Sequence, residues 1–186
     1  MSSTISARGL ISVFGSSKPR PGSAAYEQAR EVGKLLADAG FAVATGGYSG
    51  TMAAVSQGAA SEGGHVVGVG CKRIELFRPG GLNEWVVEAV QYETLQDRLL
   101  HLVTHNDGMI VLPGGIGTLS ELALAWSLLQ VKEIEPRPLV LLGEIWRDTM
   151  QTFIRSEYVP EPHATLLHYA DTPQDAVGVI QRALEN

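Results

Sequence analysis

The stretch that most constrains this chain is Met109–Gln130, which reads MIVLPGGIGTLSELALAWSLLQ. Its apolar start, Met109–Leu112, predicts a buried strand, and a glycine-rich turn, Pro113–Gly117, follows. We expect Thr118 to open a strongly apolar helix. The first N–H groups of such a helix are unpaired and lie at the positive end of its dipole, and glycine lets an anion approach the backbone closely. The stretch therefore predicts a phosphate-binding turn.

Strand and helix alternate along the chain, and the apolar runs are short and lack a regular polar alternation. This pattern is typical of a parallel sheet that is covered by helices on both faces. We predict a Rossmann-like, doubly wound α/β fold with about six or seven parallel strands in three α/β/α layers. The predicted strands are residues 10–14, 41–45, 65–69, 85–92, 109–112, 137–142 and 166–169. The predicted helices are residues 23–39, 49–61, 94–105, 118–130 and 144–158 and a last one that Thr172 caps, whereas residues 71–84 are expected to be irregular.

Length and composition narrow the class of protein. At 186 residues the chain is most simply one domain, which we place at residues 9–186 after a flexible start at residues 1–8. The net charge of −6 argues against a nucleic-acid partner, and no apolar run is long enough to span a membrane. The first residues lack the apolar segment of a signal peptide, so we expect a cytoplasmic protein. A single cysteine, Cys71, and the absence of a Cys/His cluster with zinc spacing predict no metal site.

Two common nucleotide-binding fingerprints are missing from the sequence. The dinucleotide pattern G-x-G-x-x-G does not follow the first predicted strand, and the second strand ends at Thr45 without an acidic residue. The Walker pattern G-x-x-x-x-G-K-[ST] is also absent. We therefore predict neither dinucleotide redox chemistry nor NTP hydrolysis, and no cofactor.

Glu121 and Arg98 each allow two interpretations. Glu121 follows Thr118 by three positions, which fits a capping box whose side chains satisfy N–H groups of the first helical turn. Alternatively, Glu121 is a site residue, because its helix is apolar nearly all round and follows the carboxyl end of a strand, where ligands bind in such folds. Arg98 is either a surface arginine at the edge of an apolar stripe or a guanidinium that pairs with Glu121 or with a phosphate.

Three motifs together resemble the LOG (Lonely Guy) family. They are P-G-G-x-G-T-x-x-E at Pro113–Glu121, G-G-x-x-G at Gly46–Gly50 and the first-strand ending V-F-G-S-S at Val13–Ser17. An arginine, Arg98, also lies in the helix before the strand of the first motif. The resemblance covers roughly residues 10–155, and the motif that ends at Glu121 is the specific one.

The resemblance implies a homodimeric enzyme that splits a nucleoside 5′-monophosphate, such as AMP or a cytokinin riboside monophosphate, into a free base and ribose 5-phosphate. It maps the catalytic pair of the family to Arg98 and Glu121. The predicted phosphate- and nucleotide-binding residues are Gly15, Ser16, Gly46, Gly47, Gly114, Gly115, Gly117 and Thr118. Family members are often mislabelled lysine decarboxylases, but pyridoxal phosphate chemistry needs a Schiff-base lysine, and the loop lysines Lys18 and Lys72 suit phosphate contact better.

Glycosidic cleavage develops positive charge at C1′ and the ring oxygen, and a carboxylate stabilises that charge or positions the attacking water. Glu121 suits this role when it is ionised, and we expect the helix N-terminus and Arg98 to favour the ionised form. Leu99 stands where cytokinin-type members have a lysine. A non-catalytic binder of a phosphorylated ligand, such as a nucleotide sensor or a molybdenum-cofactor carrier, is therefore the alternative. The helix after Thr118 is apolar on more faces than one sheet can cover, which predicts a homodimer.

Overall fold

The computed structural model describes residues 8–77, 80–155 and 157–185. The predicted flexible start, residues 1–8, lies outside these residues except for Arg8, whose backbone N–H donates to the Gly40 carbonyl. The strands in the described part are β1 (Leu10–Phe14), β2 (Ala42–Thr45), β3 (Val66–Cys71), β4 (Glu88–Tyr92), β5 (Gly108–Val111), β6 (Leu139–Leu142) and β7 (Leu167–Ala170). The helices are α1 (Ala24–Asp38), α2 (Thr51–Ser61), α3 (Lys72–Phe77), α4 (Leu95–Thr104), α5 (Ile116–Gln130), α6 (Glu144–Phe153), α7 (Glu161–Ala164) and α8 (Pro173–Leu184).

The strands form one parallel sheet in the order β4-β3-β2-β1-β5-β6-β7. This confirms the predicted Rossmann-like α/β fold. The chain winds outward from β1 to β4 and then crosses back, so that β5 pairs with the free side of β1. The strand order therefore reverses between β1 and β5, and in open α/β sheets ligands bind outside the carboxyl ends of the strands at this switch point.

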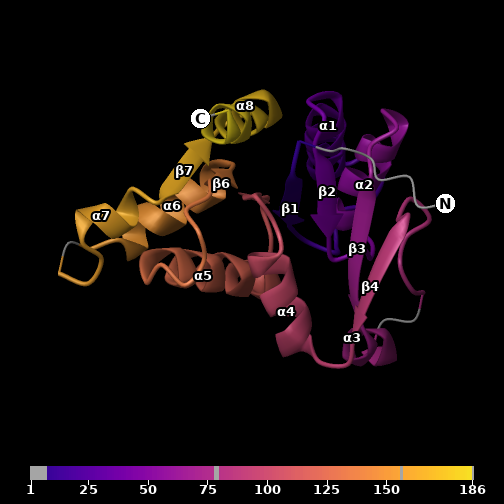
Figure 1. Cartoon of the computed structure of the whole chain (residues 1–186), viewed down its shortest axis with the longest axis horizontal. Helices are drawn as coiled ribbons and strands as arrows, with labels where there is room; N and C mark the ends of the chain where they lie inside the picture. Colours follow the sequence, from indigo (N-terminus) through magenta and orange to yellow (C-terminus); the bar gives the residue numbers. More distant parts are fainter. Residues whose placement is uncertain (1–7, 78–79, 156, 186) are drawn as a thin grey trace.

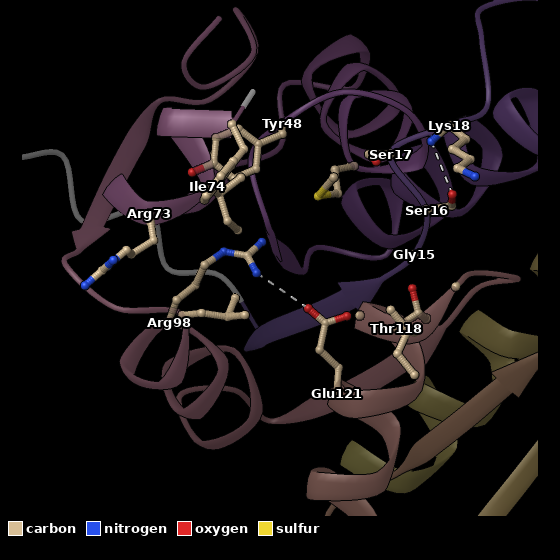
Figure 2. Close-up of a pocket in the computed structure, with 16 residues that line it drawn as sticks. Gly15, Ser16, Ser17, Lys18, Tyr48, Arg73, Ile74, Arg98, Thr118 and Glu121 are labelled. Carbon is tan, nitrogen blue, oxygen red and sulfur yellow. Dashed lines mark hydrogen bonds and ion pairs between the residues drawn. The ribbon is translucent and has the colours of Figure 1, made fainter. Parts of the chain in front are cut away.

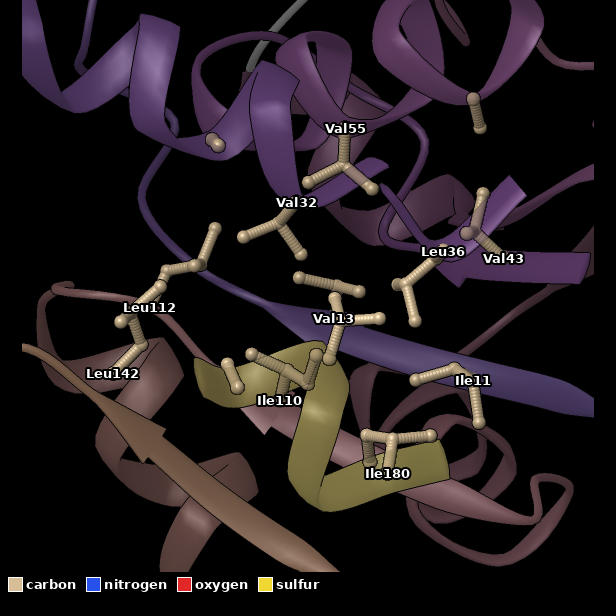
Figure 3. Close-up of a cluster of buried hydrophobic side chains, with 14 of the residues drawn as sticks. Ile11, Val13, Val32, Leu36, Val43, Val55, Ile110, Leu112, Leu142 and Ile180 are labelled. Carbon is tan, nitrogen blue, oxygen red and sulfur yellow. The ribbon is translucent and has the colours of Figure 1, made fainter. Parts of the chain in front are cut away.

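Helices cover both faces of the sheet, which gives the predicted three layers (Figure 1). The face under α1, α2 and α8 buries the residues that Figure 3 labels: Ile11, Val13, Val32, Leu36, Val43, Val55, Ile110, Leu112, Leu142 and Ile180. The face under α4, α5 and α6 buries a second cluster, which includes Leu102, Met109, Val111, Leu122, Ala125, Leu139, Leu141 and Trp146. Because both sides of each central strand are covered, the strands need no polar alternation, as their sequences indicated.

The small residues of α1 and α2 allow these two helices to pack closely. A Cβ on Gly33 would lie 2.1 Å from the Val55 carbonyl oxygen, and a Cβ on Gly58 would lie 1.9 Å from the Arg30 carbonyl oxygen. Both positions therefore require glycine for steric reasons. The close contact with α1 fixes the position of α2. The N-terminus of α2 in turn supports one side of the site described below.

Several local predictions are wrong. Residues 71–84 are not wholly irregular, because α3 (Lys72–Phe77) follows β3 directly. The α6 helix ends at Phe153 and not at Tyr158, since the next residue, Ile154, adopts an extended backbone with φ −73° and ψ 110°. The short α7 was not predicted. Most importantly, α5 begins at Ile116, two residues before the predicted start, with Gly115 as its N-cap.

Within the described ranges, no helix has both the length and the apolar composition that crossing a membrane requires.

Candidate functional site

A cavity of about 560 Å³ opens at the carboxyl edge of the sheet beside the switch point (Figure 2). It is lined by the segment after β1, the first turns of α5, the start of α4, part of α3 and the junction of β2 with α2. Seven of the ten predicted site residues line it, namely Gly15, Ser16, Arg98, Gly115, Gly117, Thr118 and Glu121. The other three, Gly46, Gly47 and Gly114, are not among the lining residues. The fold thus brings the predicted catalytic pair and most of the predicted anion-binding residues to one cavity.

The turn before α5 leaves the N-terminus of this helix open toward the cavity. The N-cap residue Gly115 has no side chain, and no side chain caps the helix in the described structure. A Cβ on Gly115 or on Gly117 would meet no atom within 4 Å, so both residues face open space. Gly114 has a different role, because a Cβ there would lie 2.2 Å from the Thr118 hydroxyl oxygen. The first N–H groups of α5 are consequently available to an anion, as the glycine-rich turn predicted.

The segment after β1 forms the opposite wall and is held by α2. The Ser16 carbonyl accepts hydrogen bonds from the Thr51 backbone N–H at 2.8 Å and from the Thr51 hydroxyl at 3.1 Å. A Cβ on Gly15 would lie 2.2 Å from the same hydroxyl oxygen. These contacts fix Ser16, whose hydroxyl oxygen accepts the Lys18 backbone N–H at 3.2 Å, and both residues line the cavity. Sequence reasoning missed Thr51, although its place at the first position of the helix after Gly50 is a signal that could have identified it.

Arg98 is a buried site residue and not a surface arginine. It is 6% exposed, and its Nε donates to the Val69 carbonyl at 2.7 Å. Its guanidinium lies 5.8 Å from the centre of the Tyr48 ring, a cation–π arrangement. A backbone acceptor on β3 and an aromatic face therefore hold the charged group in place.

Gly46 makes room for this guanidinium. A Cβ on Gly46 would lie 2.0 Å from Arg98 Nη2 and 2.5 Å from Met52 Sδ. Gly47 has a positive φ of 75°, and its N–H donates to the Thr45 hydroxyl at 3.0 Å. Gly46 thus leaves space for Arg98, whereas a Cβ on Gly47 would lie 2.4 Å from Leu82 Cδ2, away from the cavity lining.

Glu121 projects from the second turn of α5 toward Arg98 (Figure 2). Its residue is 8% exposed, and its Oε1 lies 3.9 Å from Arg98 Nη1. The helix begins at Ile116, so Thr118 is inside the helix and cannot serve as its N-cap, and the capping-box interpretation is wrong. In the described part of the chain the carboxylate accepts no hydrogen bond. It is therefore a buried acid with one distant cationic neighbour.

The pKa of Glu121 corrects the expectation that its surroundings favour the ionised form. Burial raises this pKa from the ordinary 4.5 to about 7, while the Arg98 guanidinium opposes the shift. Removal of the carboxylate from water thus outweighs the attraction of a charge that lies 3.9 Å away. A carboxyl group with a pKa near neutrality can both accept and release a proton at physiological pH, which suits general acid–base work.

The two histidines of α4 and its C-cap lie outside the cavity. His101 and His105 stack on each other with ring centres 4.4 Å apart and do not line the cavity. Among the described residues, no group of three or more His, Cys, Asp or Glu side chains is placed to hold a metal ion.

Comparison with known proteins identifies the protein family that this chain matches. Residues 8–177 match the SLOG cluster4 family. The chain is 30% identical over 176 residues to a probable cytokinin riboside 5′-monophosphate phosphoribohydrolase of Oryza sativa subsp. japonica, and this match covers 89% of the chain and 68% of the relative. It is 36% identical over 102 residues to the cytokinin riboside 5′-monophosphate phosphoribohydrolase of Mycobacterium tuberculosis, over 54% of the chain and 54% of the relative. The chain thus spans about half to two thirds of the length of these two relatives.

Solved structures share the fold. The molybdenum cofactor binding protein of Rippkaea orientalis superposes with a TM-score of 0.73 at 24% identity, over 93% of this chain and 95% of that one. At this identity the likeness concerns the architecture alone. The family match extends from two residues before β1 into α8, so that it includes the whole sheet and the cavity. The chain belongs to the SLOG cluster4 family.

Proposed function

We propose that this protein hydrolyses the N-glycosidic bond of a nucleoside 5′-monophosphate and releases a free base and ribose 5-phosphate. The observation that carries the proposal is Glu121, a buried carboxylate with a pKa of about 7 that faces a cavity between an anion-binding turn and an apolar wall. The names of the relatives from Oryza sativa and Mycobacterium tuberculosis support the same class of reaction.

The anion-binding end would hold the 5′-phosphate. The open N–H groups at the start of α5 lie on one side, and the segment with Ser16 and Lys18 lies on the other. A dianionic phosphate is attracted both to the helix dipole and to the ammonium group of Lys18. With the phosphate there, the ribose lies deeper in the cavity, near Glu121.

In the reaction a water molecule adds across the bond between C1′ and the base nitrogen. The electron pair of the breaking bond leaves with the base, the water oxygen bonds to C1′, and a proton from the water is finally carried by the base. Ionised Glu121 stabilises the positive charge that develops at C1′ and accepts the proton of the attacking water. Arg98 lies beside the carboxylate and keeps enough of it ionised near neutral pH for this role.

Binding without turnover is the second candidate, and one observation favours it. Leu99 occupies the position at which cytokinin-type members of the LOG family have a lysine. Mass spectrometry of the denatured protein after purification distinguishes the two: a retained, intact phosphorylated ligand indicates a sensor or carrier. A pyridoxal phosphate enzyme is not proposed, because Lys18 is the one lysine among the described lining residues and its side chain is exposed in a loop.

We also propose a homodimer, with the cytoplasmic location predicted from the sequence. The groove between α5 and α6 has a volume of about 450 Å³ and is largely apolar, with Leu119, Trp126 and Phe153 in its wall. Leu119 and Phe153 are 38% and 60% exposed in the single chain. A second copy would cover this surface. Sedimentation velocity should show a dimer at micromolar concentration, and a monomer there contradicts this part of the proposal.

Replacing Glu121 by glutamine should abolish hydrolysis. Glutamine keeps the shape of the side chain but can neither accept a proton nor offset positive charge at C1′, so we expect AMP turnover to fall by at least about a thousandfold. Release of adenine from AMP, followed by chromatography, measures the effect. The wild-type protein releasing no base from any nucleoside monophosphate, while correctly folded, would falsify the proposed reaction.

Replacing Gly46 by alanine should displace Arg98 without unfolding the protein. Gly46 does not have a positive φ, so alanine fits its backbone, and the atoms that the new Cβ meets are the far ends of two long side chains. We expect AMP turnover to fall by about a hundredfold, since misplacement of a site group by an ångström has effects of that size. The remote Gly178→Ala substitution on α8 is the control. Full activity in Gly46→Ala would show that the position of the guanidinium does not matter.

The raised pKa of Glu121 also predicts how stability depends on pH. Between about pH 4.5 and 7 the unfolded chain loses the Glu121 proton while the folded chain keeps it, so the stabilisation present at low pH is lost as the pH rises. The size of the shift corresponds to about 3 kcal/mol. Urea unfolding at a series of pH values should show this loss in the wild type but not in Glu121→Gln. Parallel curves for the two proteins would mean that Glu121 titrates normally.

A further inference from the structure

Polar side chains attach the short helix α3 to the rest of the protein. All six of its residues, Lys72–Phe77, are at least partly exposed, so the helix has no buried apolar anchor. Lys72 forms an ion pair with Glu93, and the carboxylate of Glu75 accepts a hydrogen bond from the Gln91 side chain at 3.0 Å. Glu75 does not line the cavity, and the reaction proposed above gives it no role.

The same carboxylate contacts Tyr48, which lies in the turn between β2 and α2. The Tyr48 hydroxyl oxygen accepts the Cys71 backbone N–H at 2.7 Å, and it lies 3.1 Å from the Cys71 carbonyl oxygen and 3.3 Å from Glu75 Oε1. Burial raises the pKa of Tyr48, so the hydroxyl keeps the proton that it shares between these two acceptors. The polar end of the ring is therefore held by β3 on one side and by α3 on the other.

The ring of Tyr48 in turn contacts the Arg98 guanidinium, whose carbon lies 5.8 Å from the ring centre. In Figure 2 Arg98 lies between Tyr48 and Glu121. Arg98 Nε donates to the Val69 carbonyl at 2.7 Å, which leaves the two Nη groups to be oriented by their other neighbours. Nη1 is the atom that lies 3.9 Å from Glu121 Oε1. A shift of the ring would thus change the distance over which Arg98 acts on the carboxylate.

We propose that Glu75 is a positioning residue for the reaction, because it fixes the Tyr48 ring that orients Arg98 toward Glu121. The inference rests on the proposed function and adds to it a residue outside the cavity. The contacts run from Gln91 on β4 through α3 to the turn after β2, and from there to α4. Since the proposed phosphate end of the cavity lies away from these contacts, loss of Glu75 lowers kcat more than it raises KM.

The direction of the pKa change at Glu121 separates positioning from a direct charge effect. Among the described residues, the charged side chains that line the cavity around Glu121 are Lys18 after β1, Arg73 on α3 and Arg98 on α4. Arg98 is the one that lowers the pKa of Glu121. When loss of Glu75 lets Arg98 move away, the pKa of Glu121 rises further. Removal of a negative charge alone would lower it instead.

Three variants test the inference. Glu75→Ala removes the contact, Glu75→Gln keeps an acceptor oxygen without the charge, and Glu93→Ala breaks the ion pair of α3 with Lys72 without touching Tyr48. In Glu75→Ala we expect kcat for AMP to fall about tenfold or more with little change in KM. The acidic limb of its kcat/KM profile should move up by roughly half a pH unit or more. Glu75→Gln should recover most of the activity, and Glu93→Ala should match the wild type.

A double variant tests whether Glu75 acts through Tyr48. Tyr48→Phe removes the hydroxyl, so adding Glu75→Ala to it should cause little further loss of kcat, because both changes break the same contact. Additive losses would mean that Glu75 acts by another route and would overturn the inference. The inference also fails if Glu75→Ala leaves kcat unchanged, or if Glu93→Ala has the same effect as Glu75→Ala.

A titration that needs no turnover keeps this inference apart from the proposed function. Carbon NMR of the Glu121 carboxyl group, assigned with the Glu121→Gln protein, should give a higher pKa in Glu75→Ala than in the wild type. An unchanged or lower pKa contradicts the positioning of Arg98 by Glu75. Absence of base release by the folded wild type contradicts the proposed reaction, and the titration then still decides whether Glu75 positions Arg98.

Discussion

The close approach of Arg98 and Glu121 is the contact on which the site depends, and it joins the two halves of the sheet. The guanidinium is held by the backbone of β3, by the ring of Tyr48 and by the space that Gly46 leaves. The carboxylate comes from α5, beyond the point where the strand order reverses. Both groups are buried, yet 3.9 Å separates their nearest charged atoms. At this distance the attraction is too weak to offset the loss of water around the carboxylate, so its pKa rises.

The glycines of the site act in three physically different ways. Gly115 and Gly117 leave the first N–H groups of α5 open to a ligand. Gly46 leaves room for a protein side chain, while Gly15 and Gly114 allow a threonine hydroxyl to pack against the backbone. The glycines predicted to bind phosphate therefore fall into two groups. Some can contact a ligand directly, and the others make room for side chains that shape the site. This division explains why the cavity can be both open at the turn and rigid behind it.

The family and the geometry of the cavity limit the ligand in complementary ways. The chain belongs to the SLOG cluster4 family, and the matching regions cover about half to two thirds of the length of the two named relatives, whose activity comes to this chain only as part of the proposed function. The cavity adds information about how the proposed ligand would be oriented. In the proposed function, the phosphate of the ligand would lie at the end lined by Ser16, Lys18 and Gly115, with its ribose toward Glu121.

Much of the fold follows from the sequence alone, because short apolar runs and glycine or proline breaks are local properties of the chain. The parallel sheet, the ends of β1 and the start of α8 after Thr172 were predictable in this way. So was the meeting of Arg98 and Glu121 at one sheet edge, since parallel strands bring their carboxyl ends together. Only the tertiary structure decided that α5 starts at Ile116 and that Gly46 leaves space for the Arg98 guanidinium. It also decided that the pKa of Glu121 rises to about 7. Each of these depends on distances to residues far away in the chain and on the exclusion of water, which no local pattern encodes.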